Sequence, residues 1–161
     1  MQAAQSIDDS RDSLIGELES AIKSGTPEKR VETLRNVTDL FLHDADKFSE
    51  EQIEVFDDVL CLLINRIETK AKAELGERLA PIDNAPLDVI QRLARDDEIA
   101  VAGPVLTQST RLSDSDLVEI AKSKSQDHLF AISGRSTLAE SVTDVLVDRG
   151  DQRVVNRVAT N

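Results

Sequence analysis

Apolar residues recur three, four and seven positions apart along most of the chain, which is the spacing of one face of an α-helix. The pattern starts with Ile7, Leu14, Leu18 and Ile22, and it stops at Gly25. A helix over residues 6–23 is therefore predicted. The same spacing returns in every later segment, so the chain is predicted to be all-α.

The next helix carries its own start signal. Thr26 can accept hydrogen bonds from the first turn, Pro27 suits the first helical position, and Glu28 adds an acid where the helix dipole favours one. These residues predict a helix from 27 to about 43.

A third start signal is the pair Ser49 and Gln52, which has the spacing of a capping box. The apolar pattern then runs from 50 to 80, interrupted by Gly76 alone. The sequence leaves two alternatives open, one long helix or two nearly collinear helices. Pro81 and Pro86 end this region.

Beyond Pro86 the predicted helices shorten to about ten residues. Segments 97–106, 127–136 and 151–160 each begin with an aspartate followed by apolar and small residues, at offsets of 30 and 24. Leu87 and Ile90 match Leu117 and Ile120 at the same offset of 30. A unit of two helices that recurs in this way predicts a solenoid, in which each unit buries its apolar face against its neighbours.

The segment DEIAVAGPVL (97–106) contains a proline inside a helical pattern. We expect Asp97 to cap this helix, and we expect Gly103, like the alanines near it, to let a neighbouring helix approach closely. Pro104 removes one backbone hydrogen bond, so a kink is predicted there. A bend in a stack of helices explains this Gly-Pro pair better than a ligand loop, because no polar cluster accompanies it.

Four stretches of the chain carry a resemblance: LFLHDADKFSEEQIEVFDDVL (40–60), APLDVIQRLARDDEIAVAGPVL (85–106), LSDSDLVEIA (112–121) and VTDVLVDRGDQRVVNRVATN (142–161). They resemble an alphaproteobacterial family known as domain of unknown function 2336, which is similar to HEAT-like and leucine-rich-variant helical repeats. The resemblance runs from Thr26 onward and brings no catalytic residues. It implies antiparallel helical hairpins stacked as a short HEAT-like, right-handed α-solenoid in a bacterial protein.

These observations together predict the domain organisation. Residues 1–161 are expected to form a single all-helical domain, with longer helices in 1–80 and short helical repeats in 86–161. Members of the family are longer, and Asn161 falls in the middle of a unit. The chain is therefore expected to be the amino-terminal part of a larger protein.

Charge and composition narrow the possible functions. The net charge is -12, and residues 1–110 carry 23 acidic against 12 basic side chains. This acidity opposes binding to phosphate backbones and predicts a protein partner with a basic patch. The sequence has no basic start followed by an apolar stretch and no apolar run of about 18 residues, so we expect a cytoplasmic protein that does not bind a membrane.

No chemical motif in the sequence predicts catalysis, a metal or another cofactor. His43, Asp44 and Asp46 form the densest group of possible metal ligands, but His128 is the chain's other histidine and lies far away in sequence. The lone Cys61 lies in an apolar run and is expected to be a small core residue.

The most distinctive group of polar residues is basic: Arg135, Arg149, Arg153 and Arg157. One interpretation is a surface for nucleic acid or an anionic ligand. The favoured interpretation pairs these arginines with acidic residues of neighbouring units, namely Asp127, Asp144, Asp148 and Asp151. The overall prediction is a non-enzymatic helical-repeat scaffold that mediates protein-protein interaction in bacterial regulation or signalling. Its oligomeric state is left open.

Overall fold

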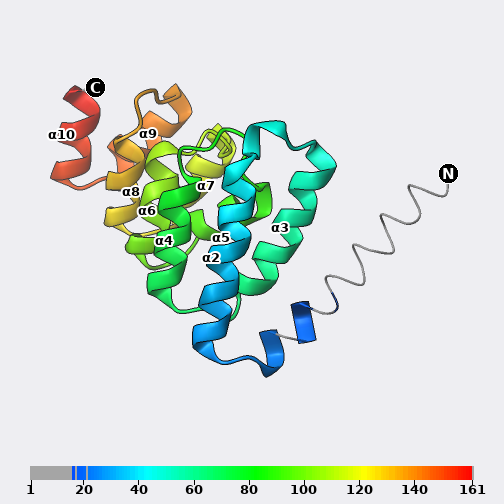
Figure 1. Cartoon of the computed structure of the whole chain (residues 1–161). Coiled ribbons are helices and arrows are strands. Elements are labelled where there is room, and N and C mark those ends of the chain that lie inside the picture. The colour runs from blue at the N-terminus through cyan, green and yellow to red at the C-terminus, as the bar shows by residue number, and fades with distance from the viewer. Residues whose placement is uncertain (1–15, 17, 21, 161) are drawn as a thin grey trace. The chain divides into compact units, whose positions relative to one another are not determined.

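A computed structural model describes residues 16, 18–20 and 22–160, and all regular elements among them are helical (Figure 1). Residues 16, 18–20 and 22–23 of the predicted first helix (6–23) are helical, and its other residues lie outside the described part of the chain. The following elements are α2 (Pro27–His43), η1 (Ala45–Lys47), α3 (Glu50–Ile64), α4 (Thr69–Leu79), α5 (Leu87–Ala94), α6 (Ile99–Gln108), α7 (Asp114–Ser123), α8 (Gln126–Ser133), α9 (Glu140–Arg149) and α10 (Gln152–Thr160). The all-α prediction is confirmed for this part of the chain.

Contacts within the chain divide it into two compact units. Unit 1 ends at Glu68, and unit 2 begins at Thr69. The division falls inside the segment 50–80, which forms two helices, α3 and α4, rather than one. The sequence placed the change from long to short helices at 80–86, a dozen residues later than this division.

The two complete helices of unit 1 start where the sequence predicts. Thr26 Oγ1 accepts a hydrogen bond from the Lys29 amide at 3.2 Å, with Pro27 at the first helical position. At α3, Ser49 Oγ accepts from the Gln52 amide at 3.2 Å, and Gln52 Oε1 accepts from the Ser49 amide at 2.9 Å. Both capping predictions are confirmed, because each polar side chain satisfies a backbone N–H that the helix itself leaves open.

Three phenylalanines pack together in unit 1. Phe41 of α2 is fully buried, and its ring centroid lies 5.3 Å from that of Phe56 on α3 and 6.0 Å from that of Phe48. Phe48 and Phe56 lie 5.0 Å apart. These rings, one pair stacked and two pairs tilted, hold α2, α3 and the loop between them around one aromatic cluster.

Unit 2 contains two rows of short helices. In one row α6 contacts α4 and α8, and α8 contacts α10; in the other row α7 contacts α9 (Figure 1). Helices adjacent in sequence also contact one another, so α5 lies against α4 and α6, and α9 against α8 and α10. The interior of unit 2 is aliphatic, with Leu93, Leu106, Ile120 and Leu129 at most 1% exposed.

Buried residues of one helix pair match buried residues of the next pair when the sequence is shifted by 27 residues. The sequence analysis had used a shift of 30. In the first row, Val101, Ala102, Val105 and Leu106 match His128, Leu129, Ile132 and Ser133, all at most 1% exposed. In the second row, Ile90, Leu93 and Ala94 match Leu117, Ile120 and Ala121. The alignment of Leu87 with Leu117 is wrong, because Leu87 is 41% exposed and Leu117 is 3% exposed.

One detail of the segment 97–106 differs from expectation. Asp97 does not cap α6; the cap residue is Glu98, and Asp96 Oδ1 accepts the Glu98 amide at 2.9 Å. Asp97 instead binds Lys124 Nζ at 2.6 Å. The α6 helix continues through Pro104 to Gln108.

The close approach expected at Gly103 occurs at Gly76 instead. A methyl group on Gly103 would meet only Ile99 of the same helix, at 3.9 Å. A methyl group on Gly76 in α4 would lie 3.0 Å from the carbonyl oxygen of Val101 in α6. The glycine that looked like a break in the pattern of residues 50–80 is therefore a contact point between two helices.

Candidate functional site

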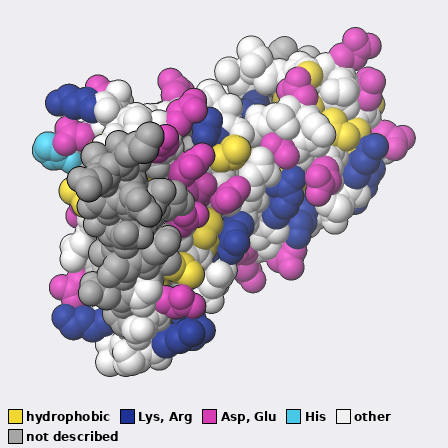
Figure 2. All heavy atoms as spheres, turned by 90° about the vertical axis from the view of Figure 1, so that its right-hand side faces the viewer, with side chains coloured by type: hydrophobic (Ala, Val, Ile, Leu, Met, Phe, Trp, Pro, Cys, Tyr) yellow, Lys and Arg dark blue, Asp and Glu magenta, His cyan; other side chains and the backbone are white. Residues whose placement is uncertain are grey.

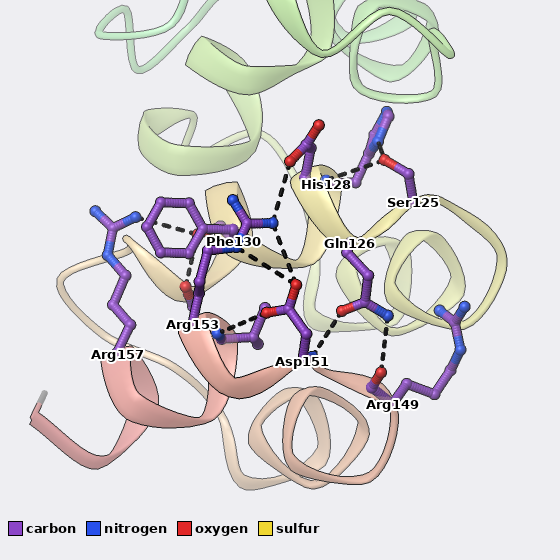
Figure 3. Close-up of polar contacts among 11 residues, drawn as sticks. Ser125, Gln126, His128, Phe130, Arg149, Asp151, Arg153 and Arg157 are labelled. Carbon is purple, nitrogen blue, oxygen red and sulfur yellow. Dashed lines mark hydrogen bonds and ion pairs between the residues drawn. The ribbon is translucent and has the colours of Figure 1, made fainter.

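The structure brings together two of the four predicted arginines, Arg153 and Arg157, around one aromatic ring (Figure 3). Both lie on α10, four residues apart, and both reach toward Phe130 on α8. Their guanidinium carbons are 5.0 Å and 4.5 Å from the ring centroid, which is the range of cation–π contacts. Arg157 Nη1 also donates to the Phe130 carbonyl oxygen at 3.2 Å.

Arg153 is held by two carboxylates. Its Nη2 lies 3.2 Å from Asp127 Oδ1 on α8 and 3.3 Å from Asp151 Oδ2. The hydrogen bonds to Asp127 and then to Asp151 raise the pKa of Arg153. Asp151 also caps α10, since its Oδ1 accepts from the Val154 amide at 3.2 Å. The predicted charge pairing is confirmed for Arg153 with Asp127 and Asp151.

Arg135 is placed elsewhere, at the end of α6. Its Nη1 and Nη2 donate to the carbonyl oxygens of Leu106 and Ser109, each at 2.6 Å. Burial lowers the pKa of Arg135, and the carboxylate of Asp114 partly offsets this effect. Arg135, which follows α8, thus binds two backbone oxygens at the end of α6, the neighbouring helix in the same row.

Arg149 occupies the matching place in the other row. It donates to the carbonyl oxygen of Ala121 and is 3.5 Å from that of Lys124, both at the end of α7. Figure 3 shows Arg149 beside Gln126 and pointing away from the pair on Phe130. Gln126 Nε2 donates to the Arg149 carbonyl oxygen at 2.9 Å, and Gln126 Oε1 accepts from the Asp151 amide at 2.7 Å.

These arginine contacts have a common physical cause. The last four carbonyl groups of any α-helix lack partners inside the helix, and buried carbonyl groups without partners are costly. Arg135, Arg149 and Arg157 supply donors to carbonyl groups of α6, α7 and α8, across sequence separations of 25 to 29 residues. Arg111, which the sequence analysis missed, also donates to a backbone carbonyl oxygen, that of Ala85 in the loop before α5, at 2.9 Å. The signal in the sequence is an arginine at or just beyond the end of several short helical segments, as at Arg135 after α8 and Arg149 in α9.

A second group missed by the sequence analysis joins α5 to α7. The carboxylate of Asp116 accepts from Gln91 Nε2 at 2.7 Å, from Arg95 Nη2 at 3.2 Å and from the Ser113 amide at 3.0 Å. Burial opposes ionisation, but the hydrogen bonds from Ser113, Gln91 and Arg95 prevail and lower the pKa of Asp116 to about 2. The carboxylate is therefore ionised at neutral pH; it caps α7 through Ser113 and connects α7 to the α5 side through Gln91 and Arg95.

The two histidines lie far from each other in sequence and have different surroundings. His128 is 1% exposed, and its Nε2 donates to the Asp96 carbonyl oxygen at 2.8 Å while its Nδ1 faces Ser125 Oγ at 2.7 Å. His43 is exposed and lies 3.3 Å from Asp44. Among the described residues no group of three or more His, Cys, Asp or Glu side chains is arranged to hold a metal ion.

Cys61 is half-buried rather than fully buried, and its thiol lies 3.7 Å from Asp57 Oδ1. It is therefore not the wholly apolar core residue that its neighbours in the sequence suggested. No described helix is both long and apolar enough to span a membrane.

Unit 1 contributes a groove along one face of α2. Its volume is about 480 Å³. Four carboxylates line it, from Glu28, Glu32, Asp39 and Glu68, together with Arg35, Asn36 and the apolar side chains of Pro27 and Val31. On the face of the molecule in Figure 2, acidic side chains are dispersed and hydrophobic ones form small separate patches. Among these carboxylates, Glu32 is paired with Lys29 Nζ at 3.5 Å.

Comparison with known proteins gave one finding. The model of a family described as "uncharacterised protein conserved in bacteria (DUF2336)" matches residues 101–161, which is less than half of the chain. Neither the comparison with curated proteins nor that with solved structures found a significant match. Over residues 101–161, which contain all four predicted arginines, the chain is similar to this bacterial family.

Proposed function

We propose that this chain is a non-enzymatic helical-repeat scaffold that binds another protein. Residues 69–160 would be antiparallel helical hairpins stacked as a short, right-handed, HEAT-like α-solenoid. The observation that carries this proposal is the double row of short helices in unit 2, in which α4, α6, α8 and α10 contact one another in order. The coincidence of buried positions at an offset of 27 residues supports the same proposal.

The chemistry of the described side chains suits display rather than catalysis. The arginines of the possible surface site are largely engaged in contacts between helices, with backbone oxygens or with acidic side chains. A stack of this kind offers a partner an extended face, on which a few anchoring side chains supply most of the affinity. We further propose a cytoplasmic setting, an alphaproteobacterial source and a role in regulation or signalling.

The net charge of -12 suggests that the partner carries a basic patch. The test is affinity capture from a bacterial lysate with the full chain as bait, followed by elution in rising salt and identification of both protein and nucleic acid. We expect a discrete protein released at moderate salt, because screening weakens contacts between exposed charges. A complex that is insensitive to ionic strength would contradict the proposal.

The alternative function is binding of nucleic acid or an anionic ligand through Arg135, Arg149, Arg153 and Arg157. Its support is weaker, because Arg135 and Arg149 donate to backbone oxygens and Arg153 binds two carboxylates. The variant Arg153→Glu/Arg157→Glu, checked for retained helicity, tests it in the same capture. Recovery of nucleic acid alone, lost in this variant, would favour the alternative.

A further inference from the structure

Burial within unit 2 falls sharply at α10. Among the described residues, four side chains of α6 and four of α8 are at most 1% exposed, whereas α9 has two such side chains and α10 has one, Val154. The helices α6 and α8 each have a neighbour on both sides in their row, and α10 contacts α8 and α9. Few buried apolar contacts are typical of the segments that open first in a folded protein.

Two arginines make polar contacts from α10 to α8. Arg153 Nη2 lies 3.2 Å from Asp127 Oδ1, but the two side chains are 51% and 57% exposed, and ion pairs so exposed contribute little to stability. Arg157 is half-buried; its guanidinium lies over the Phe130 ring and donates to the Phe130 carbonyl oxygen. Arg157 therefore makes the stronger of the two links between α10 and α8.

The end of α8 leaves room for this guanidinium. A methyl group on Gly134 would lie 2.6 Å from Arg157 Nη2 and 2.9 Å from Arg157 Cζ, which is closer than such atoms can approach. The backbone of Gly134 has a φ of -80° and a ψ of -3°, a type I turn conformation that suits most residue types. Glycine is therefore needed here for space rather than for backbone conformation.

The turn before α10 is held separately. Gln126 Nε2 donates to the Arg149 carbonyl oxygen at 2.9 Å, and Gln126 Oε1 accepts from the Asp151 amide at 2.7 Å. These bonds fix the chain as far as Asp151, so α10 can move away only beyond that residue. A released helix of nine residues would also unfold, because isolated helices of fewer than about 12 residues are marginal in water.

We propose that α10 is a strap that opens from α8 as one piece while the rest of unit 2 stays folded, and that Arg157 is its latch. In the closed strap, two guanidinium groups cover the Phe130 ring and one of them also binds Asp127 (Figure 3). Opening therefore uncovers an aromatic ring and a carboxylate that bind cationic groups in the closed state. This inference is independent of the proposed function, because it concerns a motion within the chain.

Native-state amide hydrogen exchange of the full chain tests the strap. We expect the amides of residues 155–158 to share one level of protection, within about threefold, and to be about a hundredfold less protected than those of α6. Protection that rises steadily from residue 158 back to 155 would indicate fraying from the helix end and would overturn the proposal. Equal protection in α10 and α6 would also overturn it, since α10 would then open only when unit 2 unfolds.

Gly134→Ala tests the latch. The added methyl group displaces the guanidinium of Arg157, so we expect about a tenfold loss of protection in α10. Amides of α6 should keep or gain protection, because alanine reduces the conformational entropy of the unfolded chain. The matched control is Gly103→Ala, whose methyl group would meet Ile99 of its own helix at 3.9 Å. The control should leave the protection of α10 unchanged within about twofold.

Phe130→Leu is a second latch variant, which keeps Gly134 and both arginines. Loss of the ring removes the surface over which the guanidinium groups lie, so α10 should lose protection about fivefold while α6 does not. If both variants weaken α6 and α10 equally, α10 is an inseparable part of unit 2 and the strap is wrong. If neither variant changes the protection of α10, Arg157 is not a latch and the proposal fails.

Discussion

Units 1 and 2 are both helical, but they are stabilised differently. Unit 1 has helices of 17 and 15 residues and a cluster of three phenylalanines. Each of these helices is capped at its start by a side chain that accepts from a backbone amide three residues later. Unit 2 uses helices of 8 to 11 residues, an aliphatic interior and hydrogen bonds between residues 21 to 32 positions apart. Residues 1–68 carry 16 acidic and 7 basic side chains, and residues 69–161 carry 15 and 12.

Helix length explains much of this difference. Four terminal carbonyl groups lack internal partners in every helix, which is about a quarter of the carbonyl groups in α2 but about half of those in α8. Short helices therefore need donors from neighbouring elements. Arginine fits this need because its planar guanidinium carries several N–H donors and keeps its charge.

The largest effect should follow from Phe41→Ala. The ring is fully buried between Phe48 and Phe56, so its loss should destabilise unit 1 by about 3–5 kcal/mol. Native-state amide exchange should show reduced protection in α2 and α3 but not in α6 and α8. Leu40→Ala is the control, since Leu40 is 63% exposed and should change stability by less than about 0.5 kcal/mol. Equal loss of protection in α6 would show that the two units unfold together.

Gly150→Ala tests the tight turn between α9 and α10. An added methyl group would contact the Leu146 carbonyl oxygen and lie 2.6 Å from Val154 Cγ1, which is closer than such atoms can approach. We expect a loss of about 3 kcal/mol in urea unfolding followed by circular dichroism, as for other overpacked sites. Stability within about 0.5 kcal/mol of the parent chain would show that the turn relaxes easily.

Arg135→Gln tests whether arginine contacts with carbonyl groups stabilise unit 2. The variant leaves the Leu106 and Ser109 carbonyl groups without their guanidinium donors, and a loss of about 2 kcal/mol is expected. Lys122→Gln, at an exposed position of α7, removes the same charge and should be nearly neutral. Equal midpoints of urea unfolding for the two variants would contradict our explanation of how short helices are satisfied.

The pH dependence of stability should reveal Asp116. Its pKa is about 2 in the folded chain and 3.8 when unperturbed, so its ionised form favours folding. This contribution, of about 1–2 kcal/mol, is complete above about pH 4 and is lost as pH falls toward 2. Asp116→Asn should therefore be destabilised at pH 6 and match the parent chain near pH 2. Asp144→Asn, at an exposed position of α9, should show no such difference in the same urea titrations.

The smallest effect is expected from Gly103→Ala, and it has the opposite sign. The added methyl group meets only Ile99 at 3.9 Å, and alanine favours the helix over glycine. We expect a gain of about 0.5–1 kcal/mol in the same urea experiment. A loss would mean that α6 needs a glycine beside Pro104.

The sequence predicted local features well, because they depend on a few neighbouring residues. Thr26 and Pro27, and the pair Ser49 and Gln52, define helix starts within one turn, and the structure places α2 and α3 accordingly. The start of α6 was misassigned to Asp97 because Asp96, Asp97 and Glu98 are all acidic, and geometry alone selects among them.

Contacts between distant residues were harder to predict. The offset of 27 was missed because aspartates were aligned, whereas the buried positions set the register. Arg153 and Arg157 were correctly grouped by their spacing of four residues. Side-chain charges did not predict that Arg135 and Arg149 bind carbonyl oxygens. Every residue carries a backbone carbonyl group, and only the fold shows which of these groups lack partners inside a helix.

The distribution of the four phenylalanines has a practical consequence for spectroscopy. Three of them form the cluster in unit 1, and the fourth, Phe130, lies between two guanidinium groups in unit 2. Biosynthetic labelling with fluorophenylalanine would thus place three fluorine nuclei in one unit and one in the other. A single fluorine NMR titration could then record the melting of each unit separately, in a chain that has no tryptophan or tyrosine to report on it.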